Sequence, residues 1–484
     1  MKISFGRSAA LLCALLVLFA LPFSAAARPD DTVEWGSFRG TGGSAVVDTD
    51  TPLDTAQQQW AFALKGAAEW DKAVSDPLMV NGQIYIAVGS ELLVISRSGE
   101  LAGKESLAAP IDYTCRPLYS DGNILVPLSG GRVQALAADS LETVWITESL
   151  PEHDGLAHQS LSTLVESDGY VYFGTACADW TTSYYGLFLC VEAATGDIVW
   201  QHENTEAGYY WSGAAILNGA ALVAGDDGVL TALDARTGAV LDRLQLGAPV
   251  RATTVSDGAH ALVVSTDGRL HRVTVGQDGH LGEHRSVAFA SSSTGTPAVH
   301  DGKAYVGGAQ ADYTGVFCVI DLSKMAVEQT ASLSADVKSA PLLSTAHVGG
   351  VAAYFTSNTL PGGIHVLRSG AAEAALLFSP ETADQNYCMT SIMAGPDGTL
   401  YYTNDSGKLF AVSGSGAGGE QNTTVSSSET TVASVNVSET SPAATETTPS
   451  EPTTGETDSL FFWLTLTAGS AAALLLTRRS CHRN

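Results

Sequence analysis

Residues 212–241, SGAAILNGAALVAGDDGVLTALDARTGAVL, contain short apolar runs separated by tight turns. The runs are Ala214–Leu217, Ala221–Ala224, Val229–Leu233 and, after a last turn at Asp234–Gly238, Ala239–Leu244. The first two turns are Asn218-Gly219 and Asp226-Asp227-Gly228. Asn-Gly and Asp-Gly supply the positive φ angles that hairpin turns require, so the stretch predicts a four-stranded antiparallel meander.

A lone sheet of about 40 residues cannot bury both of its faces, so it needs copies of itself on either side. The sequence contains eight such units, each with a turn that includes a glycine, namely Gly82, Gly122, Gly169, Gly219, Gly258, Gly302, Gly350 and Gly398. Successive glycines are 40, 47, 50, 39, 44, 48 and 48 residues apart. This period and strand number predict an all-β fold, an eight-bladed β-propeller of four-stranded antiparallel blades. Seven blades is the alternative if the weaker unit at Gly350 does not form one.

Two incomplete pieces of sequence suggest how the ring closes. Gln57–Leu64, which contains Trp60, is a strand pattern without a partner before it. The eighth unit ends at Val412 with three strands and lacks a fourth. We therefore expect the N-terminal strand to complete the last blade, which removes two free sheet edges.

The repeats resemble the PQQ-like β-propeller family, whose repeats share the pattern D/N-G-x-x-Y-x-G…L-x-A-L-D-x-x-T-G-x-x-x-W. The closest matches are Thr195–Trp200 and Leu230–Gly238, and Trp35–Gly40 resembles the W-x-x-F-R-G sequence that often precedes the first repeat. The resemblance covers residues 35 to 413. It implies the propeller architecture, but not an activity, because this fold carries unrelated functions.

Both ends of the chain differ in composition from the repeats. Residues 1–27 have the basic, apolar and small-residue sections of a secretion signal, with an N-terminal anchor helix as the alternative. The expected order continues with a lead-in segment (28–56), the propeller (57–413), a Ser/Thr/Glu-rich disordered stalk (414–458), a transmembrane or cell-wall sorting helix (459–477) and a basic cytoplasmic tail (478–484).

Residues 452–455 are Pro-Thr-Thr-Gly, and Pro452, Thr454 and Gly455 match the Pro-x-Thr-Gly of a Gram-positive cell-wall sorting signal. Glu451 stands where that motif has leucine, so two expectations remain open: attachment to the cell wall by sortase, or tethering by the membrane helix alone. Either way, the expected location is the extracellular face of the cell membrane or cell wall, with a single-pass C-terminal anchor.

Charge and cysteine content exclude several classes of protein. The net charge of −27 and the absence of a basic stripe argue against nucleic-acid binding. The five cysteines between the two ends are an odd number, which rules out a complete disulfide framework. Cys177 and Cys190 flank one hairpin loop and form a local disulfide in one interpretation, while buried free thiols are the other. No C-x-x-C or H-x-x-x-H sequence signals a zinc site.

Enzymatic activity is not expected. The resemblance implies that quinone-binding relatives carry a vicinal cysteine pair and calcium ligands, and no Cys-Cys occurs here. No G-x-S-x-G sequence marks a hydrolase nucleophile either. The sequence favours a non-catalytic binding or scaffold propeller without a cofactor. The alternative is a quinone-dependent oxidoreductase with an atypical cofactor site.

In a propeller, the loops that lead into the innermost strands and those that join the second and third strands open on the same face. The polar and aromatic residues expected in these loops are Trp70, Asp71, Tyr113, His158, Trp180, Tyr209, Trp211, Arg251, Tyr313 and Tyr387. Aromatic rings and directional hydrogen bonds suit a protein, a peptide or a glycan partner. The alternative interpretation is that the aromatic residues pack between blades.

Overall fold

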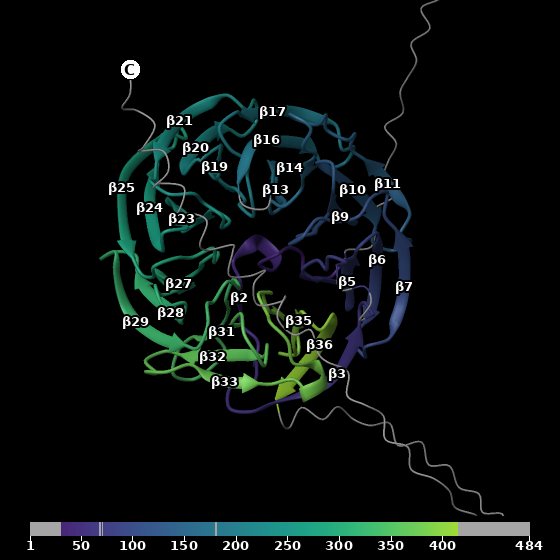
Figure 1. The fold of residues 1–484 in the computed structure, drawn as a ribbon, viewed down its shortest axis with the longest axis vertical. Helices are drawn as coiled ribbons and strands as arrows, with labels where there is room; N and C mark the ends of the chain where they lie inside the picture. The colour runs from purple at the N-terminus through teal and green to yellow at the C-terminus, as the bar shows by residue number, and fades with distance from the viewer. Residues whose placement is uncertain (1–30, 67–68, 70, 180–181, 415–484) are drawn as a thin grey trace, which may run out of the picture.

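The computed structural model describes residues 31–414 except 67–68, 70 and 180–181. Eight sheets are arranged around a central channel in the order of the sequence (Figure 1). The prediction of eight four-stranded antiparallel blades is confirmed, and the weak unit at Gly350 forms a blade of its own. The turn residues Asn218 and Gly219 have φ angles of 52° and 75°, as a hairpin turn of this kind requires.

The first four blades contain these strands, from the channel outward. Blade 1 has β4 (Leu78–Val80), β5 (Gln83–Val88), β6 (Glu91–Ser96) and β7 (Leu101–Ser106). Blade 2 has β8 (Leu118–Ser120), β9 (Asn123–Leu128), β10 (Arg132–Ala137) and β11 (Thr143–Ile146). Blade 3 has β13 (Val165–Ser167), β14 (Tyr170–Gly174), β16 (Ser183–Glu192) and β17 (Ile198–Asn204). Blade 4 has β18 (Ala215–Leu217), β19 (Ala220–Ala224), β20 (Val229–Asp234) and β21 (Val240–Gln245).

The other four blades follow the same plan. Blade 5 has β22 (Val255–Ser256), β23 (His260–Ser265), β24 (Arg269–Val275) and β25 (Leu281–Ala288). Blade 6 has β26 (Ala298–His300), β27 (Lys303–Ala309), β28 (Gly315–Asp321) and β29 (Ala326–Leu333). Blade 7 has β30 (Leu342–Ser344), β31 (Ala352–Phe355), β32 (Ile364–Arg368) and β33 (Ala375–Phe378). Blade 8 has β34 (Met393–Ala394), β35 (Leu400–Asn404), β36 (Lys408–Gly414) and β3 (Ala56–Ala63).

Ring closure occurs as the sequence predicts. β3 pairs with β36 in antiparallel register, from Ala56 opposite Gly414 to Ala63 opposite Lys408. The outermost strand of the last blade thus comes from the N-terminal part of the chain, and the ends of the ring are joined by hydrogen bonds. The hydrophobic core lies between neighbouring blades, since the second and third strands of each blade are buried and the outermost strands are largely exposed.

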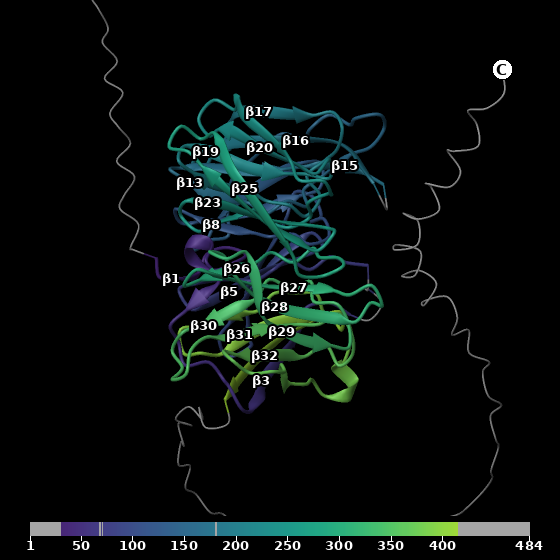
Figure 2. The same cartoon turned by 90° about the vertical axis from the view of Figure 1, so that its left-hand side faces the viewer.

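Blade 3 carries an addition on one face of the ring. The short strand β15 (Ala176–Ala178) pairs with both β16 and β12 (His158–Gln159). This is the face of the loops that join second and third strands, and we call it the loop face. The opposite face carries the turns between first and second strands and is called the turn face. In Figure 2 the ring is seen from the side, with β1 and β15 at opposite faces.

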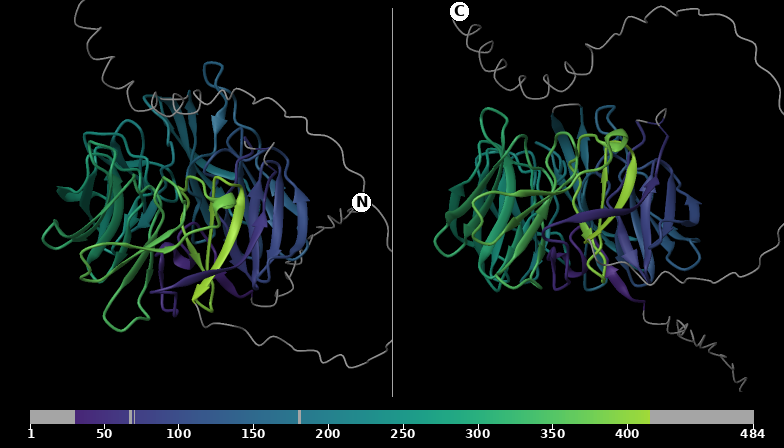
Figure 3. Two further views of the ribbon diagram at one scale, coloured as in Figure 1. Left: turned by 60° about the horizontal axis from the view of Figure 1, so that its bottom comes forward. Right: turned by 90° about the horizontal axis from the view of Figure 1, so that it is seen from below.

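The lead-in segment is part of the ring, which the sequence did not indicate. β1 (Val33–Trp35) pairs antiparallel with β4 of blade 1, and β2 (Val46–Val47) pairs parallel with β30 of blade 7. Between them the chain crosses the channel and includes the short helix η1 (Thr41–Gly43). We call residues 31–52 the N-terminal plug; its strand β1 lies at the turn face, away from the short helix η3 (Thr382–Asp384) (Figure 3). Inner strands otherwise expose unpaired backbone groups to the channel, and the plug satisfies some of these.

The expected secretion signal, stalk, sorting sequence Pro452–Gly455 and anchor helix lie outside the described residues. Within residues 31–414, apart from the gaps given above, no helix is long and apolar enough to cross a membrane.

Candidate functional site

Exposed aromatic side chains mark the loop face. Among the described residues, four aromatic side chains are exposed, and all four lie in loops or at strand ends of this face: Tyr113, Tyr184, Tyr313 and Tyr387. They are 48–61% exposed. Exposed tyrosines combine a flat apolar ring with a hydroxyl, and they are typical of contact surfaces.

Several of these residues converge around the channel. Backbone N–H of Asp405 donates to the carbonyl of Tyr387 at 2.9 Å, which joins the two loops of blade 8. Partial burial, together with the charges of Asp405 and Tyr210, raises the pKa of Tyr113 to about 12. Tyr113, Tyr210, Tyr387 and Asp405, from the loops of three blades, are therefore neighbours on the loop face, and we call this area the mouth of the channel.

An ion pair lies beside Tyr210 at the mouth. The Arg251 guanidinium donates from Nε and Nη2 to the two carboxylate oxygens of Asp226, at 2.9 and 2.8 Å. The same guanidinium lies 4.6 Å from the centre of the Tyr210 ring. The Tyr210 and Trp211 rings contact each other with their centres 5.1 Å apart. A bidentate pair and a cation–π contact fix the ring of Tyr210 in place, which lowers the entropic cost of stacking a ligand on it.

Deeper in the channel, the plug forms a floor. The Arg116 guanidinium lies 3.7 Å above the Phe38 ring of the plug, and its Nε is 3.5 Å from the carboxylate of Asp76. Arg116 Nη1 donates to the Thr163 hydroxyl at 2.9 Å, and this hydroxyl is 2.7 Å from that of Thr253. These contacts connect the inner edges of blades 1, 2, 3 and 5.

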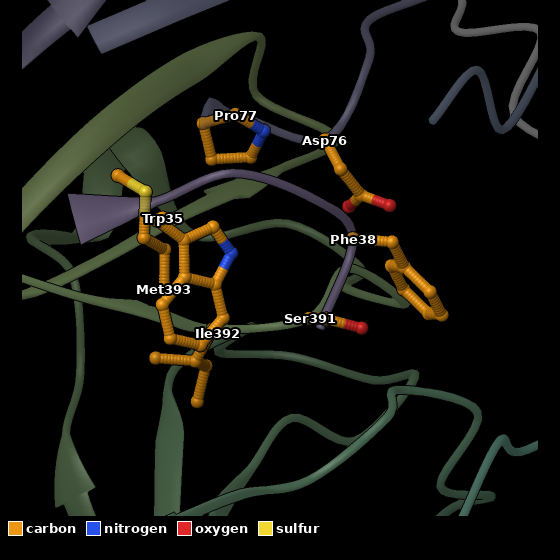
Figure 4. A pocket seen from close by; sticks show the side chains of 7 residues that line it. All are labelled: Trp35, Phe38, Asp76, Pro77, Ser391, Ile392 and Met393. Carbon is orange, nitrogen blue, oxygen red and sulfur yellow. The ribbon is translucent and has the colours of Figure 1, made fainter. Parts of the chain in front are cut away.

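A small hollow borders this floor between the plug and blades 1 and 8 (Figure 4). It is lined by Trp35, Phe38, Asp76, Pro77, Ser391, Ile392 and Met393. In the figure the Trp35 ring lies against Ile392 and Met393, while the Asp76 carboxylate lies toward Phe38. A second, wider hollow of about 260 Å³ lies at the turn face between blades 6 and 7.

Three carboxyl groups near the mouth are harder to ionise than an ordinary carboxyl. Burial raises the pKa of Asp76 to about 6, against the opposing effect of Arg116. Burial also raises the pKa of Asp112 to about 6, although this carboxylate accepts a hydrogen bond from the Ser160 N–H at 2.7 Å. The pKa of Asp405 is raised for the same reason, and Lys65 opposes the shift. Removal from water disfavours the charged form of each group.

Asp112 allows a test of this electrostatic cost. Burial raises its pKa from the ordinary 3.8 to about 6, so the folded state binds the proton more tightly and stability falls as pH rises from about 4 through 6. Asparagine stays neutral and still accepts the Ser160 hydrogen bond. We expect Asp112→Asn to match the wild type near pH 4 and to be more stable by about 1–2 kcal/mol at pH 8.

Urea unfolding from pH 4 to pH 8 measures this difference. Asp139→Asn is the matched control, because Asp139 is exposed. Equal stabilities of Asp112→Asn and the wild type at pH 8 would show that burial of the charged Asp112 carboxylate does not destabilise the folded protein.

Six of the site residues predicted from sequence lie on the loop face. Tyr113, Trp211, Arg251, Tyr313 and Tyr387 lie on the loop face, and Asp71 is exposed beside Lys65 on the same face. Trp70 and Trp180 lie outside the described residues.

Two predicted residues are buried instead. His158 is 2% exposed, and its Nδ1 is 2.7 Å from the Thr175 hydroxyl. Tyr209 is also 2% exposed and packs on Phe188, with ring centres 5.5 Å apart. His158 belongs to β12, which pairs with β15, and Tyr209 belongs to the core between blades 3 and 4, so the alternative interpretation, packing inside the ring, applies to Tyr209.

Cys177 and Cys190 are buried free thiols. Cys177 lies opposite Tyr185 and belongs to the core between blades 2 and 3, whereas Cys190 lies opposite Tyr172 and belongs to the core between blades 3 and 4. The hairpin does not bring the two sulfur atoms together, since they face opposite sides of the blade. The interpretation as free thiols fits the structure.

Other residues of the mouth were missed by sequence reasoning. Arg116, Phe38 and Asp76 come together only because the plug crosses the channel, and no local pattern indicates such a crossing. Tyr184 and Tyr210 lie within loop segments that the sequence marks as rich in aromatic residues, so composition was the available signal.

The residues present do not fit a quinone cofactor held as the family resemblance implies. The described cysteines are buried within or between blades, and none neighbours another in sequence. The channel interior is filled by the plug, with Phe38 under Arg116. In the part of the chain that the structure describes, no three His, Cys, Asp or Glu side chains form a cluster suited to a metal ion.

Comparison with known proteins places the chain among β-propellers. The family model of the outer membrane protein assembly factor BamB matches residues 44–203 and 185–413. An uncharacterized protein of Rickettsia conorii is 30% identical over 129 residues, a match that spans 26% of this chain and 28% of that protein.

Solved structures share the fold at low sequence identity. A quinohemoprotein alcohol dehydrogenase from Comamonas testosteroni is 12% identical with a TM-score of 0.58, over 78% of this chain and 80% of that one. BamB from Moraxella catarrhalis is 14% identical with a TM-score of 0.52, over 74% of this chain and 100% of that one. The computationally designed Ika8 protein is 13% identical with a TM-score of 0.52, over 74% and 99% of the two chains. At such low sequence identity, these structural similarities show only that the fold is shared.

Proposed function

We propose that this chain, which belongs to the PQQ-repeat family of the outer membrane protein assembly factor BamB, is a non-catalytic scaffold that binds a partner through its loop face. The fold of this family serves both binding proteins and enzymes. The observation that carries the proposal is the position of the four exposed tyrosines, all of which lie on the loop face. The partner would be a protein, a peptide or a glycan.

The chemistry of the mouth supports such a partner. Tyr113 and Tyr387 offer exposed rings for stacking, and Asp405 and the Arg251–Asp226 pair offer directional hydrogen bonds between them. Sugar rings and peptide side chains both bind to this combination of flat apolar surface and fixed polar groups. The closed ring below supplies rigidity, so little conformational entropy is lost when a partner binds.

We also propose that the propeller is held at the outer cell surface. The support comes from sequence beyond the described residues: the apolar N-terminal segment, the Ser/Thr/Glu-rich stretch, and Leu460–Leu476 followed by Arg478 and Arg479. Pro452, Thr454 and Gly455 add cell-wall attachment as one route. The acidic net charge of −27 suits a surface that repels nucleic acid.

A binding assay with loop-face variants tests the proposal. Arrays of cell-wall glycan fragments and of peptides would be screened with the full chain, and affinities for the best ligand compared. We expect Tyr113→Ala/Tyr387→Ala to bind at least about tenfold more weakly, because each lost stacking contact costs about 1 kcal/mol. Val348→Ala is the control on the turn face, where Val348 is fully exposed.

The same assay on intact cells tests the location. Cells that carry the full chain should bind the ligand, whereas a chain that ends at residue 414 should appear in the medium with the same affinity. Unchanged affinity of the double tyrosine variant would contradict the binding surface, and retention of the truncated chain on cells would contradict the anchor.

A quinone-dependent oxidoreductase is the second candidate, favoured by the fold similarity to alcohol dehydrogenases. Titration of the full chain with pyrroloquinoline quinone and calcium, followed by tryptophan fluorescence, separates the two, together with a dye-linked assay on alcohols and sugars. We expect neither binding nor dye reduction, because the channel is filled by the plug and no cysteine pair is present. Tight binding with dye reduction would replace the scaffold proposal.

A further inference from the structure

Two arginine side chains lie beside the plug, one buried and one largely buried. Arg39 of the plug is 7% exposed, and its hydrogen bond to another residue runs from Nη2 to the Ser44 carbonyl at 3.3 Å. No carboxylate of the described residues forms an ion pair with it. Arg116 lies over the ring of Phe38, the residue before Arg39. Burial, together with the positive charge of Arg116, lowers the pKa of Arg39 to about 10. The Arg116 side chain is 14% exposed and has a single carboxylate partner, Asp76.

Buried hydrogen-bond donors without partners surround these two cations. Within the described residues, the buried polar atoms that lack a hydrogen-bond partner include Arg39 Nε, Trp211 Nε1, Ser212 Oγ and Thr254 Oγ1, and also Arg116 Nε, which has only the ion-pair contact of 3.5 Å with the Asp76 carboxylate. The three nitrogen atoms carry N–H groups that can only donate. Ser212 and Thr254 are at most 1% exposed. Their hydroxyls can donate or accept, so donors outnumber acceptors in this set of atoms.

Backbone contacts show that these residues are neighbours. Arg116 Nη1 donates to the Trp211 carbonyl at 3.3 Å, and Thr254 N–H donates to the Gly213 carbonyl at 2.9 Å. Gly213 forms bridges to Thr163 and Thr253, the two hydroxyl residues below Arg116. Trp211, Ser212 and Thr254 are thus close to Arg116 in space, at the inner ends of blades 2, 4 and 5.

A buried cation without a counter-ion destabilises a protein strongly, and one carboxylate balances only one of the two arginines. From this imbalance we propose that the inner end of the channel binds a carboxylate group between Arg39 and Arg116. The single uncompensated positive charge matches a monovalent anion, and the planar guanidinium fork matches the two oxygens of a carboxylate. The source is either a free small carboxylate or the carboxylate of a polypeptide that enters from the loop face. This site does not depend on the loop-face partner.

Small carboxylates serve as direct probes. The full chain would be titrated with formate and with acetate at constant ionic strength, with chloride as the balancing anion, and the melting temperature Tm recorded. A ligand that binds only the folded state raises Tm in proportion to the logarithm of its excess over Kd. We expect Tm to rise with formate, and Arg39→Gln to weaken the apparent affinity at least about tenfold, the size of one charge-assisted hydrogen bond.

Three further variants make the test independent of how Arg39→Gln folds. Asp76→Asn removes the carboxylate that competes for Arg116, so formate should bind several-fold more tightly. Arg236→Gln, at an exposed arginine, controls for general charge effects and should leave the affinity unchanged. The tyrosine double variant should also leave it unchanged, which separates this site from the proposed partner surface.

A comparison of peptides identifies the source of the carboxylate. A short peptide with a free C-terminal carboxylate that binds more tightly than acetate, and loses this advantage on C-terminal amidation, would indicate insertion of a polypeptide. Equal affinities would indicate a small free carboxylate. If formate raises Tm equally in the wild type, Arg39→Gln and Asp76→Asn, water satisfies these donors and the proposal is overturned.

Discussion

Trp200→Ala should lower the free energy of unfolding by about 3–5 kcal/mol, the range for removal of a large buried aromatic side chain. Trp200 lies on β17, the outermost strand of blade 3, and is only 8% exposed. Its Nε1 donates to the Ala235 carbonyl of blade 4 at 3.0 Å. Its ring covers Gly238, where a Cβ atom would lie 2.6 Å from the ring at a φ angle of 71°. The alanine variant therefore leaves a cavity between two blades, and the Ala235 carbonyl keeps only its second hydrogen bond, from the Tyr172 hydroxyl at 3.1 Å.

Urea unfolding followed by circular dichroism measures the loss, and two variants separate its causes. Trp200→Phe keeps much of the ring but removes the hydrogen bond, so it should cost about 1–2 kcal/mol. Ile198→Ala is the control on the same strand, because Ile198 is 44% exposed, and it should change stability by less than about 0.5 kcal/mol. A Trp200→Ala variant that unfolds like Ile198→Ala would show that the contact between blades contributes little.

The same contact occurs at two other junctions between blades. Trp60 of blade 8 covers Gly99 of blade 1 and donates to the Arg97 carbonyl at 2.9 Å. Trp145 of blade 2 covers Gly196 of blade 3, with an equivalent bond of 3.1 Å to the Ala193 carbonyl. In each case the glycine belongs to the turn between the third and fourth strands of the next blade. The Thr-Gly turn and the tryptophan of the repeat pattern are therefore two halves of one contact between blades.

This explains why the fold could be predicted from sequence. Strand alternation and Asn-Gly or Asp-Gly turns fix each blade locally, and their repetition at 40–50 residues fixes the ring. The closing strand could be predicted as well, because Trp60 occupies the position of Trp145 and Trp200 in a strand without a neighbour. Even the weak unit at Gly350 forms a blade, since its neighbours offer two apolar faces for it to cover.

The plug could not be predicted, because nothing local defines it. β1 and β2 contain three and two residues, and their pairing partners lie more than 40 and almost 300 residues away. Their pairing depends on the free edges of inner strands, which exist only once the ring has formed. The floor of the candidate site, which combines Phe38 with Arg116, was missed for the same reason.

The predicted loop residues show which part of the candidate site could not be predicted from sequence. Tyr113, Tyr313 and Tyr387 are exposed on the predicted face, whereas Tyr209 in a similar loop is buried. Residues 207–213 contain three aromatic residues in a row, and a sequence pattern cannot tell which of them turns inward. Tyr209 turns inward because Gly174 leaves room for its ring: a Cβ atom there would lie 2.4 Å from the Tyr209 side chain.

Removal of the closing strand should have the largest effect of any change. A chain that begins at residue 65 lacks both β3 and the plug, so β36 becomes the open outer edge of blade 8. The core between blades 8 and 1 then loses Trp35 and Leu64 and the half-buried Trp60 and Phe62. We expect this chain to lose cooperative unfolding and to associate through its free edge, because an unpaired apolar strand is a template for aggregation. Size-exclusion chromatography and urea unfolding measure both effects.

A rearranged chain separates closure of the ring from the contribution of the plug. Ala56 lies opposite Gly414, so a two-residue Asn-Gly turn can join residues 65–414 directly to residues 56–64 as a hairpin. This chain regains the closing strand but not the plug, and it should be monomeric and unfold cooperatively. It should remain less stable than the intact chain by about 3 kcal/mol or more, because the burial of Trp35, which is 4% exposed, is lost.

Two outcomes would contradict this account. If residues 65–414 alone were as stable as the rearranged chain, the hydrogen bonds between β3 and β36 would not be needed to close the ring. If the rearranged chain matched the intact one, the plug would fill the channel without stabilising it.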